Sequence, residues 1–142
     1  MNTLLKISVV SLAAWLFVCR ASASDADSTS KIHISGRVLG ASNAHTVYVM
    51  LLDSAGFEKQ PVRQLLLQPD SVYSYSFSIT PGRWAVSAFE DLNGNGILDM
   101  GFFGPKEPSG FWRPFHAKRK PRFDDVVSQI GHTISDADVK LR

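Results

Sequence analysis

Apolar and polar residues alternate with a period of two through much of this chain. The clearest example is the segment 71–79, in which large apolar or aromatic residues are separated by serines. Alternation of this kind predicts a β-strand with one buried face. Shorter alternations at 31–38, 83–89 and 136–141, and a β-branched and apolar run at 46–52, predict further strands. The large residues of the clearest segment are Tyr73, Tyr75, Phe77 and Ile79.

The order of these segments predicts the fold class. Turn residues such as Pro81-Gly82 separate them, no segment shows a long helical period, and no internal repeat is present. Residues 62–67 are compatible with a strand or with a short helical turn. The segment from Asp91 to Pro121 breaks the rhythm, because it is rich in Gly, Pro and aromatic residues. We therefore predict an all-β chain, a single β-sandwich of about seven strands with a long irregular segment after a central strand.

The N-terminus has the features of a secretory signal. Lys6 precedes an apolar run at 7–18, and Ala21-Ser22-Ala23 supplies the small residues that a signal peptidase requires. A membrane anchor is the alternative, but the run is short for a span of about 20 residues. A second alternative is lipidation of Cys19, although Val18 stands where a lipobox has a small residue. We predict a periplasmic or secreted protein, cleaved after Ala23.

This cleavage divides the chain into a signal peptide (1–23), a disordered lead-in (24–30) and a β-sandwich domain (31–142), with no transmembrane span left. Cys19 is the only cysteine, so no disulfide stabilises the mature chain. Loss of Lys6 and Arg20 leaves 13 of the 15 basic residues against 13 acidic ones. The mature chain is then close to neutral, and the charge gives no reason to expect a nucleic-acid partner.

A loop rich in Asp and Asn is the main candidate site. Side chains that carry oxygen recur at alternate positions, a glycine occupies the sixth place, and the next residue can offer its carbonyl. Ca²⁺ prefers six to eight such hard oxygen ligands. Phe102 stands at the twelfth place, so this is not a complete EF-hand loop, and a plain Asn-Gly turn without metal is the alternative. The predicted ligands are Asp91, Asn93, Asn95, Ile97, Asp99 and Glu107.

The segment 111–122 is the second candidate, because it combines basic residues with aromatic ones and contains no acid. The functional interpretation is weak binding of anions or glycans by Trp112, Arg113, Lys118, Arg119, Lys120 and Arg122. The alternative is a solvated loop that balances acidic neighbours. The nearby aromatic residues either stack on a ligand or hold the long loop against the sheets, and Trp112 is the best candidate for an exposed ring. They are Phe102, Phe103, Phe111, Trp112 and Phe115.

Several motifs resemble the bacterial domain-of-unknown-function (DUF) family 2141. The resemblance is carried by residues 81–86 and 91–99, by Gly104-Pro105-Lys106-Glu107 and Gly110-Phe111, and by residues 121–126. It implies an exported protein with a transthyretin-like or immunoglobulin-like sandwich and no established activity. That family usually has a histidine before the first loop aspartate, where this chain has Glu90.

The sequence gives little reason to expect an enzyme. The mature chain has no thiol nucleophile, its four histidines lack metal-ligand spacing, and no serine lies in a nucleophile elbow. A carboxylate pair from Glu90 and Glu107 is the one arrangement that a hydrolase could use. We predict a non-catalytic envelope or secreted module of unknown partner, possible partners being an envelope glycan or another surface protein. It is stabilised by Ca²⁺; the alternatives are a carbohydrate- or polyanion-binding accessory protein and a hydrolase.

Overall fold

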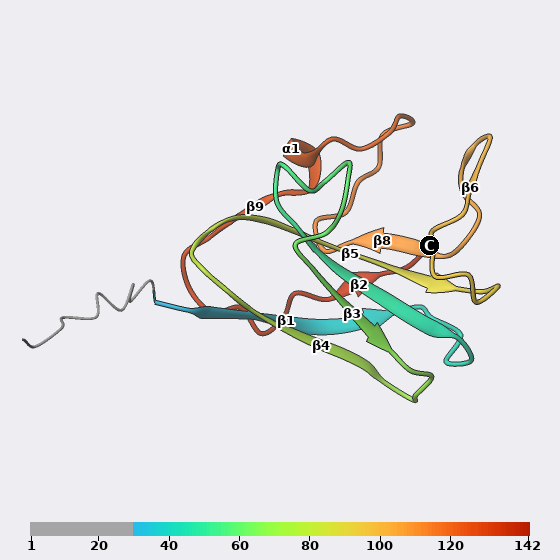
Figure 1. The fold of residues 1–142 in the computed structure, drawn as a ribbon, viewed down its shortest axis with the longest axis horizontal. Coiled ribbons are helices and arrows are strands. Elements are labelled where there is room, and N and C mark those ends of the chain that lie inside the picture. The colour runs from blue at the N-terminus through green and yellow to red at the C-terminus, as the bar shows by residue number, and fades with distance from the viewer. Residues whose placement is uncertain (1–29) are drawn as a thin grey trace, which may run out of the picture.

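The computed structural model describes residues 30–142 (Figure 1). The predicted signal peptide and all but the last residue of the predicted lead-in lie outside these residues. The described part contains ten strands and one helix, α1 (Phe123–Val126), so the prediction of an all-β chain is confirmed. The longer strands are β1 (Ile32–Leu39), β2 (Thr46–Leu52), β3 (Arg63–Leu67), β4 (Tyr73–Ile79) and β5 (Gly82–Asp91).

The remaining strands are short, and they explain why the count exceeds the expected seven. Three of them lie within the segment from Asp91 to Pro121, which therefore is not irregular throughout. Within residues 30–142 no helix is long and apolar enough to cross a bilayer. The short strands are β6 (Met100–Gly101), β7 (Gly104–Pro105), β8 (Ser109–Phe111), β9 (Ser128–Ile130) and β10 (Val139–Lys140).

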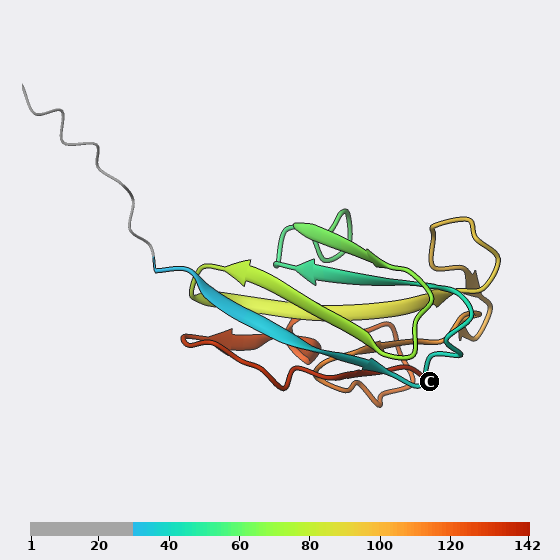
Figure 2. The same ribbon diagram turned by 90° about the horizontal axis from the view of Figure 1, so that it is seen from below.

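The long strands form two sheets that run along the molecule (Figure 2). The first has the order β10-β1-β4, and the second has the order β3-β2-β5-β8, with β9 also paired to β5. Neighbouring strands are antiparallel except for β1 and β10, which are parallel and pair Val38 with Val139. A separate hairpin joins β6 to β7.

The main core lies between the two sheets. In β4 every large residue is buried and every serine is exposed, which confirms the strand predicted from the alternation. These side chains meet Ile34 from β1, Val47 and Val49 from β2, and Val86 from β5. Burial of one such side chain contributes about 1.5–3 kcal/mol. Two sheets enclosing one apolar layer are consistent with a β-sandwich.

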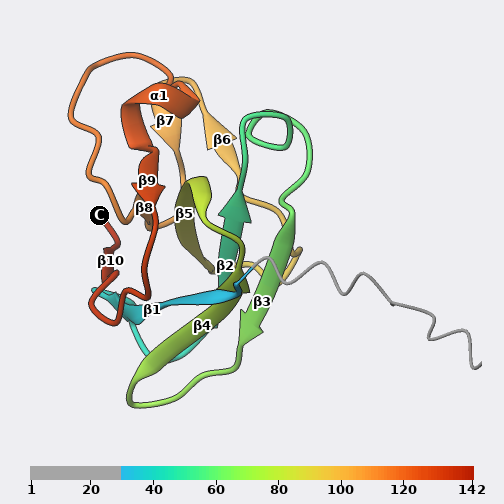
Figure 3. The ribbon, with the colours of Figure 1, turned by 90° about the vertical axis from the view of Figure 1, so that its left-hand side faces the viewer.

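A smaller core covers the outer face of β5. Val86 and Ala88 face the main core, whereas Ala85 packs with Leu52 and Val126 in this second cluster. Rings from the segment 111–123 and Phe57 complete it. Figure 3 shows α1, β8 and β9 on the same side of the molecule, next to β5. Residues 85–91 are therefore buried on both faces, which positions the end of β5 rigidly at the start of the candidate loop.

Candidate functional site

The loop from Asp91 to Asp99 is folded around the carboxylate of Asp91, which is 3% exposed at the end of β5. Its Oδ1 accepts the backbone N–H groups of Gly94 (2.9 Å) and Asn95 (3.2 Å), and its Oδ2 accepts that of Gly96 (2.8 Å). Gly94 and Gly96 have φ values of 74° and 75°, a conformation that glycine adopts without steric cost. The two glycines therefore allow three successive N–H groups to point at one carboxylate.

Three of the predicted ligand side chains meet at one point. The Nδ2 atoms of Asn93 and Asn95 both donate to Oδ2 of Asp99, at 2.5 and 3.1 Å. The Oδ1 atom of Asn93 accepts the Asn95 N–H (3.1 Å), and that of Asn95 accepts the Ile97 N–H (2.9 Å). Each amide oxygen therefore keeps one free lone pair.

Glu107 fastens the two ends of this loop. It is 5% exposed, and its two oxygens accept the N–H groups of Leu92 (2.9 Å) and Asp99 (3.1 Å). The Lys106 N–H also donates to the Asp99 carbonyl (2.8 Å). The structure places Glu107 as a brace between β7 and the loop, while its role as a metal ligand stays a prediction.

The donor set of the loop suits a hard cation. It comprises the carboxylates of Asp91 and Asp99, the amides of Asn93 and Asn95, and the Ile97 carbonyl. Asp91 already accepts three hydrogen bonds, which leaves about one acceptor position on it. The set can then supply roughly five oxygens where Ca²⁺ takes six to eight, with water as the remainder. Residues 30–142 contain no group of three or more His, Cys, Asp or Glu side chains placed to hold a metal.

A second polar cluster, around Glu90, did not emerge from the sequence as a site. Glu90 is 1% exposed and accepts hydrogen bonds from the Ser42 N–H, at 3.1 and 3.0 Å to its two oxygens, and from the Ser42 hydroxyl. His45 Nδ1 lies 3.2 Å from Glu90 Oε1. Burial by itself would raise the pKa of Glu90, but the hydrogen bonds from Ser42 and His45 outweigh it, so that pKa is lowered. The sequence singled out Glu90 but gave no sign that Ser42 and His45 would lie beside it.

This cluster does not have the geometry of a catalytic triad. The Ser42 hydroxyl and Glu90 both contact the same ring nitrogen of His45, Nδ1, at 3.2 Å each. In a triad the histidine uses one nitrogen for the nucleophile and the other for the carboxylate. Glu90 here holds the loop 40–45 against the end of β5.

Two of the five basic residues of the second candidate site are paired with acids. Arg119 forms two hydrogen bonds with Asp125 (2.7 and 2.8 Å), and Lys120 lies 3.3 Å from Glu58. The Arg119 side chain and then the Arg122 N–H lower the pKa of Asp125 to about 2. Arg113 donates to the Ser128 hydroxyl (2.7 Å), and Lys118 is exposed.

The aromatic residues divide into two groups. Trp112 is half-buried and packs against the main core with the Arg113 guanidinium 5.6 Å from its ring, whereas it was expected to be the best candidate for an exposed ring. Phe111 and Phe115 hold the segment to β5 through the smaller core, as one prediction proposed. Phe102 and Phe103 do not hold the segment against the sheets, because they are 96% and 98% exposed at the turn between β6 and β7.

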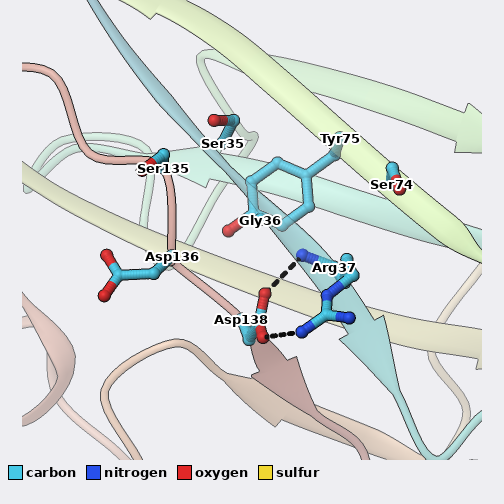
Figure 4. Close-up of a pocket in the computed structure, with 8 residues that line it drawn as sticks. All are labelled: Ser35, Gly36, Arg37, Ser74, Tyr75, Ser135, Asp136 and Asp138. Atoms are coloured by element: carbon cyan, nitrogen blue, oxygen red, sulfur yellow. Dashed lines mark hydrogen bonds and ion pairs between the residues drawn. The ribbon is translucent and has the colours of Figure 1, made fainter.

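A hollow over β1 and β4 is lined mainly by polar side chains (Figure 4). Arg37 and Asp138 form an ion pair across it (3.1 Å), and the Arg37 N–H donates to the same carboxylate (2.8 Å). The Tyr75 hydroxyl donates to the Ala137 carbonyl and is thereby occupied. The remaining lining consists of Gly36, Ser35, Ser74, Ser135 and Asp136.

Residues 40–137, which include the Asp91–Asp99 loop and the cluster around Glu90, match the family described as an uncharacterized protein conserved in bacteria (DUF2141). The chain belongs to this family. No curated protein and no solved structure matches the chain. Membership in DUF2141 assigns no activity, so function has to be argued from the loop and the surface.

Proposed function

We propose that this chain is an exported, non-catalytic β-sandwich module of the immunoglobulin-like or transthyretin-like kind, stabilised by one Ca²⁺ ion in the Asp91–Asp99 loop. The apolar layer between the two sheets supports the sandwich. The apolar run at 7–18 followed by Ala21-Ser22-Ala23 supports export to the periplasm or beyond.

The observation that carries the calcium proposal is the convergence of Asn93, Asn95 and Asp99. Their side chains meet within 2.5–3.1 Å, next to a carboxylate that the loop already surrounds. A Ca²⁺ ion at this point replaces the two amide N–H groups on Asp99 and attracts the amide oxygens instead. With two carboxylates, the expected dissociation constant is on the order of 10⁻⁴ to 10⁻³ M, as in extracellular modules.

The bound ion would stabilise the point at which the β6–β7 hairpin joins the loop. Asp99 directly precedes β6, and its carbonyl accepts the N–H of Lys106 at the end of β7. An ion that fixes Asp99 therefore also restrains the hairpin. This is a stabilising role, which needs no reaction at the site.

Thermal unfolding in chelator and then in millimolar CaCl₂ tests this proposal. At ten times its dissociation constant the ion stabilises the folded state by about 1.4 kcal/mol, or roughly 5 °C in Tm. Asp99→Asn keeps the shape of the side chain and removes its charge, so the shift should disappear. Asp136→Asn, at an exposed aspartate of the Figure 4 hollow, is the matched control and should keep it. Identical midpoints in chelator and calcium contradict the proposal.

Terbium luminescence gives an independent readout. The Tyr48 hydroxyl lies beside Gly96, 3.2 Å from where a Cβ would stand on that glycine. Tb³⁺ bound in the loop should therefore emit on excitation of tyrosine, and Ca²⁺ should displace it. Tyr48→Phe should reduce the emission and leave the Tm shift unchanged, whereas Asp99→Asn should abolish both.

A carbohydrate- or polyanion-binding role is the second candidate, and the pairing of Arg119 and Lys120 with acids makes it weaker than the sequence suggested. Retention on heparin tests it directly. If the basic segment binds polyanions, the Lys118→Ala/Arg119→Ala/Lys120→Ala variant should elute at lower salt than wild type. Hydrolysis by Glu90 and Glu107 is not favoured, because Glu90 already accepts hydrogen bonds from Ser42 and Glu107 from Leu92 and Asp99.

A further inference from the structure

The tip of the β6–β7 hairpin carries an exposed pair of aromatic rings. Phe102 and Phe103 are 96% and 98% exposed, and their rings contact each other edge to face with centroids 5.0 Å apart. Met100 and Ile97, which precede the rings in the chain, are 62% and 66% exposed. Single exposed hydrophobic residues are ordinary, but two exposed rings in contact with each other, with further exposed apolar residues close by in the chain, indicate a contact surface.

The shape of this surface is convex. The hairpin projects away from the two sheets (Figure 1), and its two strands are only two residues long each. Its backbone is closed by the pairing of Met100 with Pro105 and of Gly101 with Gly104, and by the Lys106 N–H on the Asp99 carbonyl (2.8 Å). In such a narrow projection the two side chains at the end can enter the interfacial region of a bilayer while the backbone of the hairpin stays hydrated.

The segment between the hairpin and α1 adds basic side chains. Residues 100–122 contain six basic side chains and one acidic side chain, the buried Glu107. Arg119 and Lys120 are paired with Asp125 and Glu58, which leaves Lys106, Arg113, Lys118 and Arg122 without an ion pair within residues 30–142. The stem of Lys106 packs over Gly101, next to the turn of the hairpin. The hairpin and the basic segment between β8 and α1 project toward the same end of the molecule in Figures 1 and 3. This combination complements a surface of apolar chains beneath anionic headgroups.

A second copy of the chain is a poorer match for the two rings. The hollow in Figure 4 is lined by serines, Arg37 and two aspartates together with Gly36 and Tyr75. A second hollow between β3 and β4 is lined by Arg63, Gln64, Ser76 and Ser78 together with Leu65 and Phe77. Neither is a predominantly apolar depression that matches Phe102 and Phe103. A fluid bilayer needs no such depression.

We propose that the β6–β7 hairpin is a membrane-docking element, which inserts Phe102 and Phe103 into the interface of an anionic lipid surface while the neighbouring basic residues contact the headgroups. The proposal does not depend on calcium, so its tests are made in chelator.

Sedimentation with vesicles of phosphatidylcholine and phosphatidylglycerol measures this docking. We expect wild type to bind and Phe102→Ser/Phe103→Ser to lose about 100-fold in partition coefficient, or roughly tenfold per ring. Leu66→Ser/Val72→Ser, which removes two apolar residues that are 53% and 56% exposed elsewhere, is the control and should bind like wild type. All proteins carry the same N-terminus, so residues 1–29 contribute equally. Rising salt should weaken binding.

Insertion itself is read from Phe103→Trp, whose fluorescence should shift to the blue and be quenched by brominated lipid. Because both phenylalanines are almost fully exposed, the variants should melt like wild type, which separates loss of docking from loss of folding. Equal vesicle binding by wild type and the double serine variant would overturn the proposal. A second result would also overturn it. If wild type does not bind vesicles but self-associates without lipid, and the double serine variant does not self-associate, then the two rings contact a second copy of the chain.

Discussion

Replacement of Glu90 by glutamine is the sharpest test of the packing at the end of β5. The carboxylate is 1% exposed and accepts the Ser42 N–H at 3.1 and 3.0 Å, the Ser42 hydroxyl, and a contact from His45 at 3.2 Å. Glutamine has the same shape, but its NH₂ group turns one acceptor into a donor that faces other donors. Hydrogen bonds to a buried charge contribute about 1.5–3 kcal/mol, and one oxygen remains. We therefore expect Glu90→Gln to lower the free energy of unfolding by about 2–3 kcal/mol at pH 7.

The effect should depend on pH in one direction. The folded-state pKa of Glu90 lies below its ordinary value, because hydrogen bonds from Ser42 and His45 outweigh the effect of burial. Such a group stabilises the fold above its unfolded pKa, near 4.3, and the stabilisation is lost as the pH falls through the folded pKa. The difference between wild type and Glu90→Gln should therefore shrink as the pH falls below about 4.

Urea unfolding followed by circular dichroism at pH 7 and pH 3 measures this difference. With a slope of about 1–3 kcal/mol/M, the expected loss moves the midpoint by roughly 1 M or more. Glu58→Gln is the control, because Glu58 is exposed and its ion pair with Lys120 (3.3 Å) contributes at most about 0.5 kcal/mol. Equal losses in the two variants, or a Glu90→Gln deficit that stays undiminished at pH 3, would refute the reasoning.

Two further substitutions test the contact between β1 and the segment 134–141. A Cβ on Gly36 would lie 2.3 Å from the Ala137 carbonyl oxygen, so Gly36→Ala should lower the free energy of unfolding by about 1–3 kcal/mol or more, measured by thermal melting. Gly131→Ala is the control and should be neutral, because the space around Gly131 is open. Tyr75→Phe removes the buried hydroxyl that donates to Ala137 and should cost about 1 kcal/mol in urea unfolding; unchanged stability would contradict that hydrogen bond.

The strands with one exposed face could be predicted from the sequence. The alternation at Tyr73–Ile79 is visible because serines mark the solvent side, and the structure buries every other residue there. The burial of β5 on both faces was not visible. Its outer cover comes from residues 111–126, and a local pattern contains no information about which distant segment packs over it.

In the candidate sites, too, features made by residues close in sequence could be predicted, whereas contacts between distant residues could not. The loop around Asp91 could be found because all its polar residues are close in sequence. The basic segment was overestimated, since Glu58 approaches Lys120 from 62 residues away. The clamp on Glu90 was missed, because Ser42 lies 48 residues before it. For Phe102 and Phe103 the sequence left packing against the sheets and stacking on a ligand open, and only the hairpin geometry shows that they project outward.

The parallel pairing of β10 with β1 has a consequence for the timing of folding. Ser35 and Leu39 are hydrogen-bonded to Ile134 and Leu141, about a hundred positions further along the chain, and Val139 is fully buried beside them. The first sheet thus stays incomplete until nearly the whole polypeptide is present, and contacts of such long range slow folding. If the chain is exported as proposed, the first sheet closes only after the last strand has left the translocation channel, whereas the second sheet needs no residue beyond 111 for β3, β2, β5 and β8.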